Sequence, residues 1–172
     1  MSTVPNEGNA PAMTLPITIH AQYIKDLSFE NPSPIASFTN ETNAQPNISV
    51  GIQAKADNLG GRNFEVVLEI RIDATRDKTP LFVTELSYAG IITLGDTVGE
   101  DEAGPLLMIE SPRLLFPFAR NILADVTRDG GFPPLMLAPV DFAALYEQQK
   151  NQAVQEGKEG KPVKNGKDDS KK

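Results

Sequence analysis

Apolar and polar residues alternate along four runs in the first part of the chain, which is the period of a strand with one buried face. The apolar positions of these runs are Leu15, Ile17, Ile19, Ala21 and Tyr23; Ile48, Val50, Ile52 and Ala54; Phe64, Val66, Leu68, Ile70 and Ile72; and Phe82, Leu86, Tyr88 and Ile92. In the third run Glu65, Glu69 and Arg71 take alternate positions, as an antiparallel sheet with one solvated face requires. Residues 57–61 tolerate positive φ and predict a hairpin between the second and third runs. We therefore predict a four-stranded antiparallel sheet, whose simplest order is a meander.

The period changes to that of a helix after an acidic loop predicted over residues 95–104. The residues at helical spacing are Leu115, Phe118, Ala119, Ile122 and Val126. Gly130-Gly131 supplies the left-handed residue that ends such a helix. Ser111-Pro112 would make a good N-cap and first-turn pair, but Pro117 could equally be the first helical residue, and we favour a kinked or late start.

Residues 132–139 form an apolar stretch with three prolines, which lack the donor that a helix interior or a central strand needs. We expect an extended loop that either covers the core as a lid or borders an apolar groove suited to an extended peptide. Asp141 then caps a second helix running to about Glu156, with Val140 and Leu145 placed as a hydrophobic staple. The fold class is therefore α+β.

Composition narrows the class of protein. The 172 residues favour one domain, and the absence of cysteine excludes disulfides and thiolate metal sites. The first residues do not read as a secretory signal, and no apolar stretch is long enough for a membrane helix, so we expect a cytosolic protein that does not insert into a membrane. The net charge is −7, and because the lysine-rich segment 157–172 is positive, the body is more acidic still. An acidic body disfavours nucleic acid as a partner and suits a basic protein surface. Residues 1–14 and 157–172 are predicted to be disordered.

Candidate chemistry is sparse, and no enzyme, cofactor or metal site is expected. His20 is the single histidine, and no orienting acid or nucleophile accompanies it in the pattern. The acidic cluster at Asp96 and residues 100–102 lacks the spacing of a calcium loop, so solvated side chains are the better interpretation. The glycine pairs form no phosphate-binding signature.

Four segments, taken in order, resemble the SecB family of bacterial protein-export chaperones. They are Tyr23-Ile24-Lys25-Asp26-Leu27-Ser28-Phe29-Glu30-Asn31-Pro32, Phe64-Glu65-Val66-Val67-Leu68, Leu115-Phe116-Pro117-Phe118-Ala119-Arg120, and Gly131-Phe132-Pro133-Pro134-Leu135-Met136-Leu137-Ala138-Pro139-Val140-Asp141-Phe142. The resemblance covers about Leu15 to Gln155 and implies a chaperone domain over residues 15–156. It implies a four-stranded antiparallel sheet followed by two helices, assembled as a dimer of dimers. The implied function is that of an ATP-independent holdase for non-native precursor proteins, which it passes to the SecA motor ATPase.

The resemblance also implies three sets of site residues. Apolar grooves for precursor chains would draw on Phe82, Phe118, Phe132, Leu135, Leu137 and Phe142. The docking surface for SecA would use Asp26, Glu30, Val83 and Glu85, and tetramer contacts would fall on the first helix and near Thr84, Leu86 and Tyr88, where an outward apolar side chain is otherwise unexplained.

The alternative is a SecB-like chaperone of a toxin–antitoxin system, which the presence of the docking acids argues against. No partner is assigned to the lysine-rich tail, and residues between Pro32 and Pro46 match the family poorly and contribute no groove residue.

Overall fold

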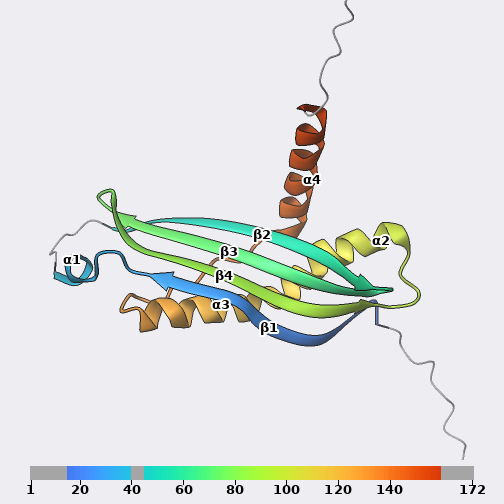
Figure 1. The fold of residues 1–172 in the computed structure, drawn as a ribbon, viewed down its shortest axis with the longest axis horizontal. Helices are drawn as coiled ribbons and strands as arrows, with labels where there is room; N and C mark the ends of the chain where they lie inside the picture. Colours follow the sequence, from blue (N-terminus) through green and yellow to red (C-terminus); the bar gives the residue numbers. More distant parts are fainter. Residues whose placement is uncertain (1–14, 40–44, 160–172) are drawn as a thin grey trace, which may run out of the picture.

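The computed structural model describes residues 15–39 and 45–159, so the predicted disorder of residues 1–14 and 160–172 lies outside the described residues, whereas residues 157–159, also predicted to be disordered, are helical. Four long antiparallel strands form one twisted sheet (Figure 1): β1 (Ile17–Glu30), β2 (Asn47–Gly60), β3 (Asn63–Arg76) and β4 (Thr79–Leu94). Their order is β1-β4-β3-β2. The meander is therefore wrong. Strands β2 to β4 are joined by hairpins, but β1 lies beside β4, as in a Greek key.

The alternation in β2, β3 and β4 places the predicted apolar side chains on one face. Ile52, Ile70 and Leu86 stand in register across the three strands. Strand β1 departs from the prediction because its pairing with β4 shifts between Ile19 and Ala21 and again between Ile24 and Asp26. Each bulge moves the following residues to the opposite face. Ala21 and Tyr23 therefore do not share the face of Ile17 and Ile19.

Both β-hairpins turn on residues with positive φ. The predicted hairpin between β2 and β3 is confirmed, with Gly60 and Gly61 at φ 118° and 58°. The hairpin between β3 and β4 instead uses Asp77 and Lys78 at φ 49° and 67°. Side chains with a Cβ adopt that region at a steric cost, so this second turn is less favourable than the first.

The helical region begins earlier than predicted. Helix α2 (Glu100–Pro105) continues through a π-helical turn, η1 (Leu106–Glu110), into α3 (Ser111–Asp129). The acidic residues 100–102 therefore form the first turn of α2 and not a loop, and the late start at Pro117 is wrong. The π turn fits a proline at position 112, which cannot donate to the preceding turn; the Ser111 hydroxyl donates 2.8 Å to the Leu106 carbonyl instead.

The predicted end of α3 is confirmed. Gly131 has φ 88°, and the amides of Gly131 and Phe132 donate to the carbonyls of Arg128 and Thr127 at 3.0 and 3.1 Å, a Schellman motif. An extended loop follows, and the Asp141 carboxylate then caps α4 (Phe142–Glu159) by accepting from the amides of its first turn at 3.1 and 3.0 Å.

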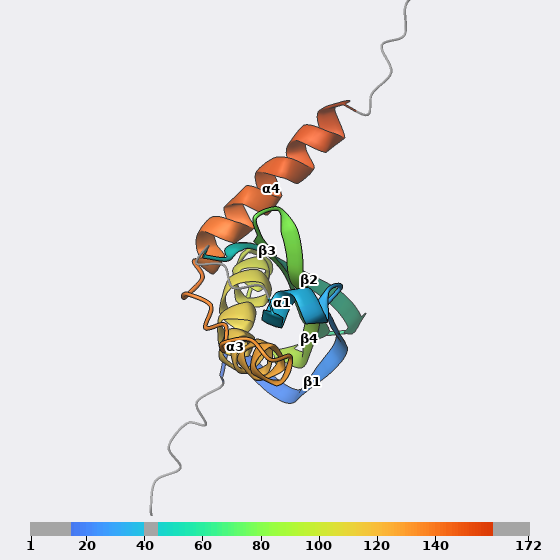
Figure 2. The ribbon, with the colours of Figure 1, turned by 90° about the vertical axis from the view of Figure 1, so that its left-hand side faces the viewer.

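Helix α4 runs past the predicted end at Glu156 and extends away from the sheet (Figures 1 and 2). A short helix that the sequence did not predict, α1 (Pro34–Thr39), follows β1.

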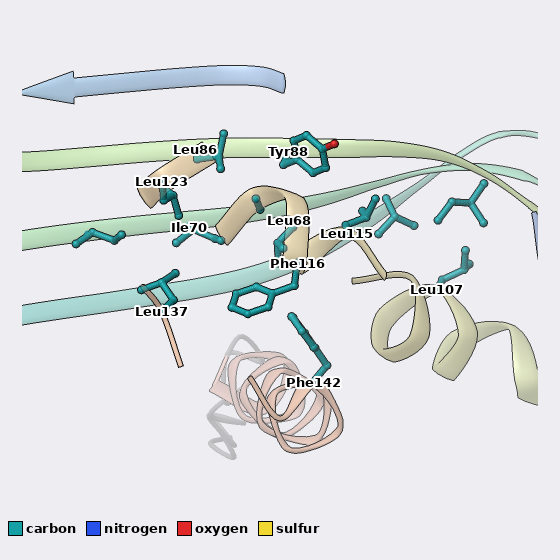
Figure 3. Packing of buried hydrophobic residues seen from close by; sticks show 14 of the residues in the cluster. Leu68, Ile70, Leu86, Tyr88, Leu107, Leu115, Phe116, Leu123, Leu137 and Phe142 are labelled. Carbon is teal, nitrogen blue, oxygen red and sulfur yellow. The ribbon is translucent and has the colours of Figure 1, made fainter. Parts of the chain in front are cut away.

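The core lies between one face of the sheet and α3, with η1 and the start of α4 at its margin. Figure 3 shows Leu68, Ile70 and Leu86 from the strands among Leu115 and Leu123 from α3. The opposite face of the sheet, called here the outer face, carries the polar positions of β3 and β4. No helix in residues 15–39 or 45–159 is long and apolar enough to cross a membrane.

Candidate functional site

Three aromatic rings meet at one end of the sheet, beyond the C-terminus of α3. Phe29 at the end of β1 stacks on Phe82 of β4 at 5.5 Å between ring centroids, and Phe132 lies 4.8 Å from Phe82 and 6.3 Å from Phe29. Phe29 stands opposite Thr84 in the register, which makes Phe82 its diagonal neighbour on the same face. The Schellman turn brings Phe132 back onto this pair. We call Phe29, Phe82 and Phe132 the aromatic cluster.

A close backbone approach fixes the cluster against the end of α3. A Cβ atom at Gly130 would lie 2.5 Å from Cε1 of Phe29, so only glycine fits there without moving the ring. Phe29 was missed in the sequence analysis as a site residue, because the bulges of β1 hide its phase. Its place in the segment from Tyr23 to Pro32, which resembles the SecB family, was the signal that could have pointed to it.

The loop after α3 is hydrogen-bonded to the helix at its centre, and some of its side chains are exposed. The Leu135 amide donates 2.9 Å to the hydroxyl of Thr127, which is buried and donates in turn to the Leu123 carbonyl at 2.9 Å. Leu135 is half-buried and Leu137 is buried, whereas Met136 between them is 59% exposed. The loop is thus both a lid on the core and an apolar surface feature.

The six predicted groove residues do not form one surface. Phe132 and Leu135 are half-buried on the loop, whereas Phe82 beside Phe132 is only 5% exposed. Leu137 is 6% exposed, and Phe142 is 1% exposed and meets Phe116 edge-on at 5.8 Å (Figure 3). The sixth, Phe118, is 51% exposed on α3 and stacks on Tyr88 of β4. Phe82, Leu137 and Phe142 are therefore core side chains and not exposed groove residues.

A hollow at the edge of the sheet was missed by the sequence analysis. It has a volume of about 410 Å³, lies between edge strand β2 and α4, and is lined by Val50, Ile52 and Leu145 together with four glutamines, one on β2 and three on α4. Val50 and Ile48 on this edge are 42% and 41% exposed. Only the packing of α4 beside β2 creates this hollow, and sequence periodicity does not report it.

The predicted docking acids lie on the outer face, away from α3. Glu30 pairs in register with Val83, Ser28 with Glu85, and Asp26 with Ser87, so Asp26, Glu30, Val83 and Glu85 share one face. Glu85 forms an ion pair with Arg71, while no basic side chain in the described part of the chain pairs with Asp26 or Glu30. The sheet itself therefore separates these acids from the aromatic cluster.

Further along the outer face, a polar network joins β1 to β3. Glu65 accepts hydrogen bonds from Lys25 at 2.6 Å and from the Tyr23 hydroxyl. These bonds lower the pKa of Glu65 below its ordinary value and raise the pKa of Tyr23. Nearby, His20 bonds to the Thr93 hydroxyl at 2.8 Å, which confirms a hydrogen-bonded strand residue.

Thr84, Leu86 and Tyr88 do not point outward, so that part of the prediction is wrong. Thr84 is fully buried and its hydroxyl donates 2.7 Å to the Ser28 carbonyl, while Leu86 and Tyr88 are 1% and 7% exposed. Even-numbered positions of β4 face α3, because their register partners are the core residues of β3. Their apolar character is thus explained within one protomer.

The comparisons with known proteins agree with one another. Residues 10–153 match the family model described as preprotein translocase subunit SecB. The protein-export protein SecB of Maricaulis maris is 50% identical over 87% of this chain and 87% of its own length. The protein-export protein SecB of Afipia carboxidovorans is 50% identical over 84% of this chain and 88% of its own length. The protein-export protein SecB of Rhodopseudomonas palustris is 49% identical over 89% of this chain and 94% of its own length.

Among solved structures, a SecB-like chaperone of Mycobacterium tuberculosis, in complex with a ChAD peptide from an antitoxin, shares the fold. The TM-score is 0.59 at 13% identity, over 72% of this chain and 90% of that one.

Proposed function

The chain belongs to the SecB family of protein-export chaperones, and we propose that it holds non-native precursor polypeptides in the cytoplasm without ATP and passes them to the SecA motor ATPase. The observation that carries this proposal is the separation of two surfaces, an apolar one around the loop after α3 and an acidic one on the outer face. Export relatives at 50% identity favour this role over that of a toxin–antitoxin chaperone, since the antitoxin-bound relative is only 13% identical.

The client surface centres on the aromatic cluster and the loop that follows it. Exposed Met136 and half-buried Phe132 and Leu135 offer adaptable apolar contact without directional demands, which suits clients of many sequences. The hollow beside β2 offers a separate contact, because an edge strand can pair with the backbone of an extended client. Leu137 would anchor the loop on the core, and Phe142 would contribute only through the packing of that core, since both side chains are buried.

The motor would dock on Asp26, Glu30, Val83 and Glu85. The unpaired acids supply charge that steers and orients a basic partner, and Val83 opposite Glu30 supplies a half-buried apolar contact. Because the clients bind on the other side of the sheet, a loaded chaperone keeps this surface accessible.

Assembly as a dimer of dimers is supported by α3. Leu114 and Phe118 are 46% and 51% exposed and stand one turn apart on the same helix face, where a second copy would cover them. Tyr88 stacks beneath Phe118 at 6.5 Å. Tyr88, with Thr84 and Leu86, would then shape this interface from the inner side of the sheet.

The test combines light scattering after size exclusion with aggregation of a slow-folding precursor diluted from denaturant, in the absence of ATP. We expect a tetramer that suppresses scattering. A monomer that leaves the precursor to aggregate would overturn the proposal.

The separation of surfaces is tested by reversing charge on the outer face. The double variant D26K/E30K should lose SecA binding and keep precursor holding, because only the docking charges change. The matched control D129K/E147K makes the same charge change at side chains that are 72% and 64% exposed on α3 and α4, and it should retain both activities. Equal loss of both activities in D26K/E30K would contradict the separation.

A further inference from the structure

One basic residue stands inside the predicted docking surface. Arg71 of β3 lies directly opposite Glu85 of β4 in the register and pairs with it through Nη1. Its Nε and Nη2 donate to the Asp73 carboxylate at 2.9 and 2.8 Å. Arg71 therefore holds two carboxylates of the outer face at once, in the bidentate geometry that guanidinium favours.

The docking acids are thus not equivalent. Glu85 already has a cation, whereas Asp26 and Glu30 carry negative charge that no basic side chain of the described residues neutralises. A cationic side chain of a partner that approaches Glu85 must either displace Arg71 or be repelled by its positive charge.

There is room for such an exchange beside Arg71. A hollow of about 410 Å³ lies on the outer face and is bordered by Arg71, Glu85 and Asp26. Gly51 of β2 contributes no side chain to it, and a Cβ there would meet no atom within 4 Å. A basic side chain of a partner could enter this hollow and reach Glu85 from the solvent.

We propose that Arg71 is an internal competitor for the docking surface, which weakens and shortens the contact with the basic surface of SecA. This inference rests on the docking function proposed above. The Arg71–Glu85 pair is solvent-exposed, at 54% and 47% for the two side chains, so it is screened and readily exchanged and does not block the site. Its effect is to moderate affinity, so that a carrier that must hand over its client also detaches.

The experiment measures the affinity of the full chain for purified SecA by calorimetry in 50 mM salt, comparing R71Q with R128Q. Arg128 is a matched control, because it is 56% exposed, also pairs with two carboxylates, Asp125 and Asp129, and lies on α3 away from the outer face. We expect R71Q to bind about two- to fivefold more tightly than the wild type and R128Q to stay within about 1.5-fold. Arg71→Thr serves as a second variant, since threonine is well accepted in strands.

A double variant tests whether the effect runs through Glu85. In the E85Q background the increase in affinity for SecA that R71Q causes should fall to half or less of its value in the wild-type background, because the carboxylate that pairs with Arg71 is gone. Unchanged or weaker binding of R71Q and R71T, or an equal gain in R128Q, would overturn the role of Arg71 while leaving the docking function intact. Loss of the docking function itself would appear differently, as no SecA binding by the wild type or no effect of D26K/E30K, and would overturn both.

Discussion

Replacing Gly130 by alanine tests whether the aromatic cluster is as tightly held as its geometry indicates. Gly130 has φ −72° and ψ 0°, a conformation open to alanine, so backbone entropy alone would stabilise the variant by about 0.4–1 kcal/mol. Against this, the new Cβ would lie 2.5 Å from Cε1 and 3.1 Å from Cε2 of Phe29. That ring is stacked on Phe82 at 5.5 Å, and Phe132 lies 6.3 Å from it and contacts Phe82. Overpacking of this kind costs about 1–3 kcal/mol, so we expect a net loss of about 1–2 kcal/mol.

Urea unfolding at one fixed protein concentration measures the change, since the proposed assembly would make stability concentration-dependent. Gly51→Ala is the control, because nothing lies within 4 Å of its Cβ and it should not be destabilising. In a Phe29→Ala background the clash is absent, and Gly130→Ala should become neutral or stabilising. A stabilised single variant, or the same loss in both backgrounds, would refute the argument.

Three further predictions concern stability. Lys78→Gly should stabilise the chain by about 0.5–1 kcal/mol in urea unfolding, because glycine accepts the φ of 67° without steric cost; a loss would contradict the strained turn. Thr127→Val should cost about 1–3 kcal/mol because the Leu135 amide loses its acceptor, whereas Thr127→Ser should cost much less; equal losses would show that the hydroxyl is unimportant. The hydrogen bond from Lys25 holds the pKa of Glu65 below 4.5, so the ionised carboxylate stabilises the fold above that pH, and this stabilisation is lost as pH falls through the lowered pKa. Glu65→Gln should therefore make the free energy of unfolding fall less steeply below pH 4.5, and an unchanged fall would argue against this role of Glu65.

Much of the sheet follows from the sequence because the apolar positions of β2, β3 and β4 recur at every second residue through the middle of each strand, where the register is regular. The hairpin glycines and the Asp141 cap were also predictable, since each satisfies a local backbone need. The order of the strands was not, because alternation reports which face is buried and not which strand is the neighbour. The bulges of β1 were equally invisible, because one extra residue in a strand has no compositional mark.

The helical region shows how local propensity is overridden. Pro112 and Pro117 indicated a kinked or late helix start, yet the backbone is already helical from Glu100 and stays so to Asp129 by admitting a π turn and packing against the sheet. For the site, the pattern predicted an apolar extended loop and the resemblance supplied residue numbers. The burial of Phe142 and the pairing of Arg71 with Glu85 needed the tertiary arrangement, since both depend on contacts between distant segments.

The position of β1 has a consequence for synthesis of the chain. Strand β1 is made first, but its hydrogen-bonding partner is β4, with Ile17 opposite Leu94, so it must remain unpaired on the ribosome until the hairpins of β2, β3 and β4 exist. Phe29, Asp26 and Glu30 all lie on β1. Neither the proposed client surface nor the proposed docking surface can therefore be complete before β4 has emerged, so a nascent chain would engage neither clients nor the motor before its own sheet is closed.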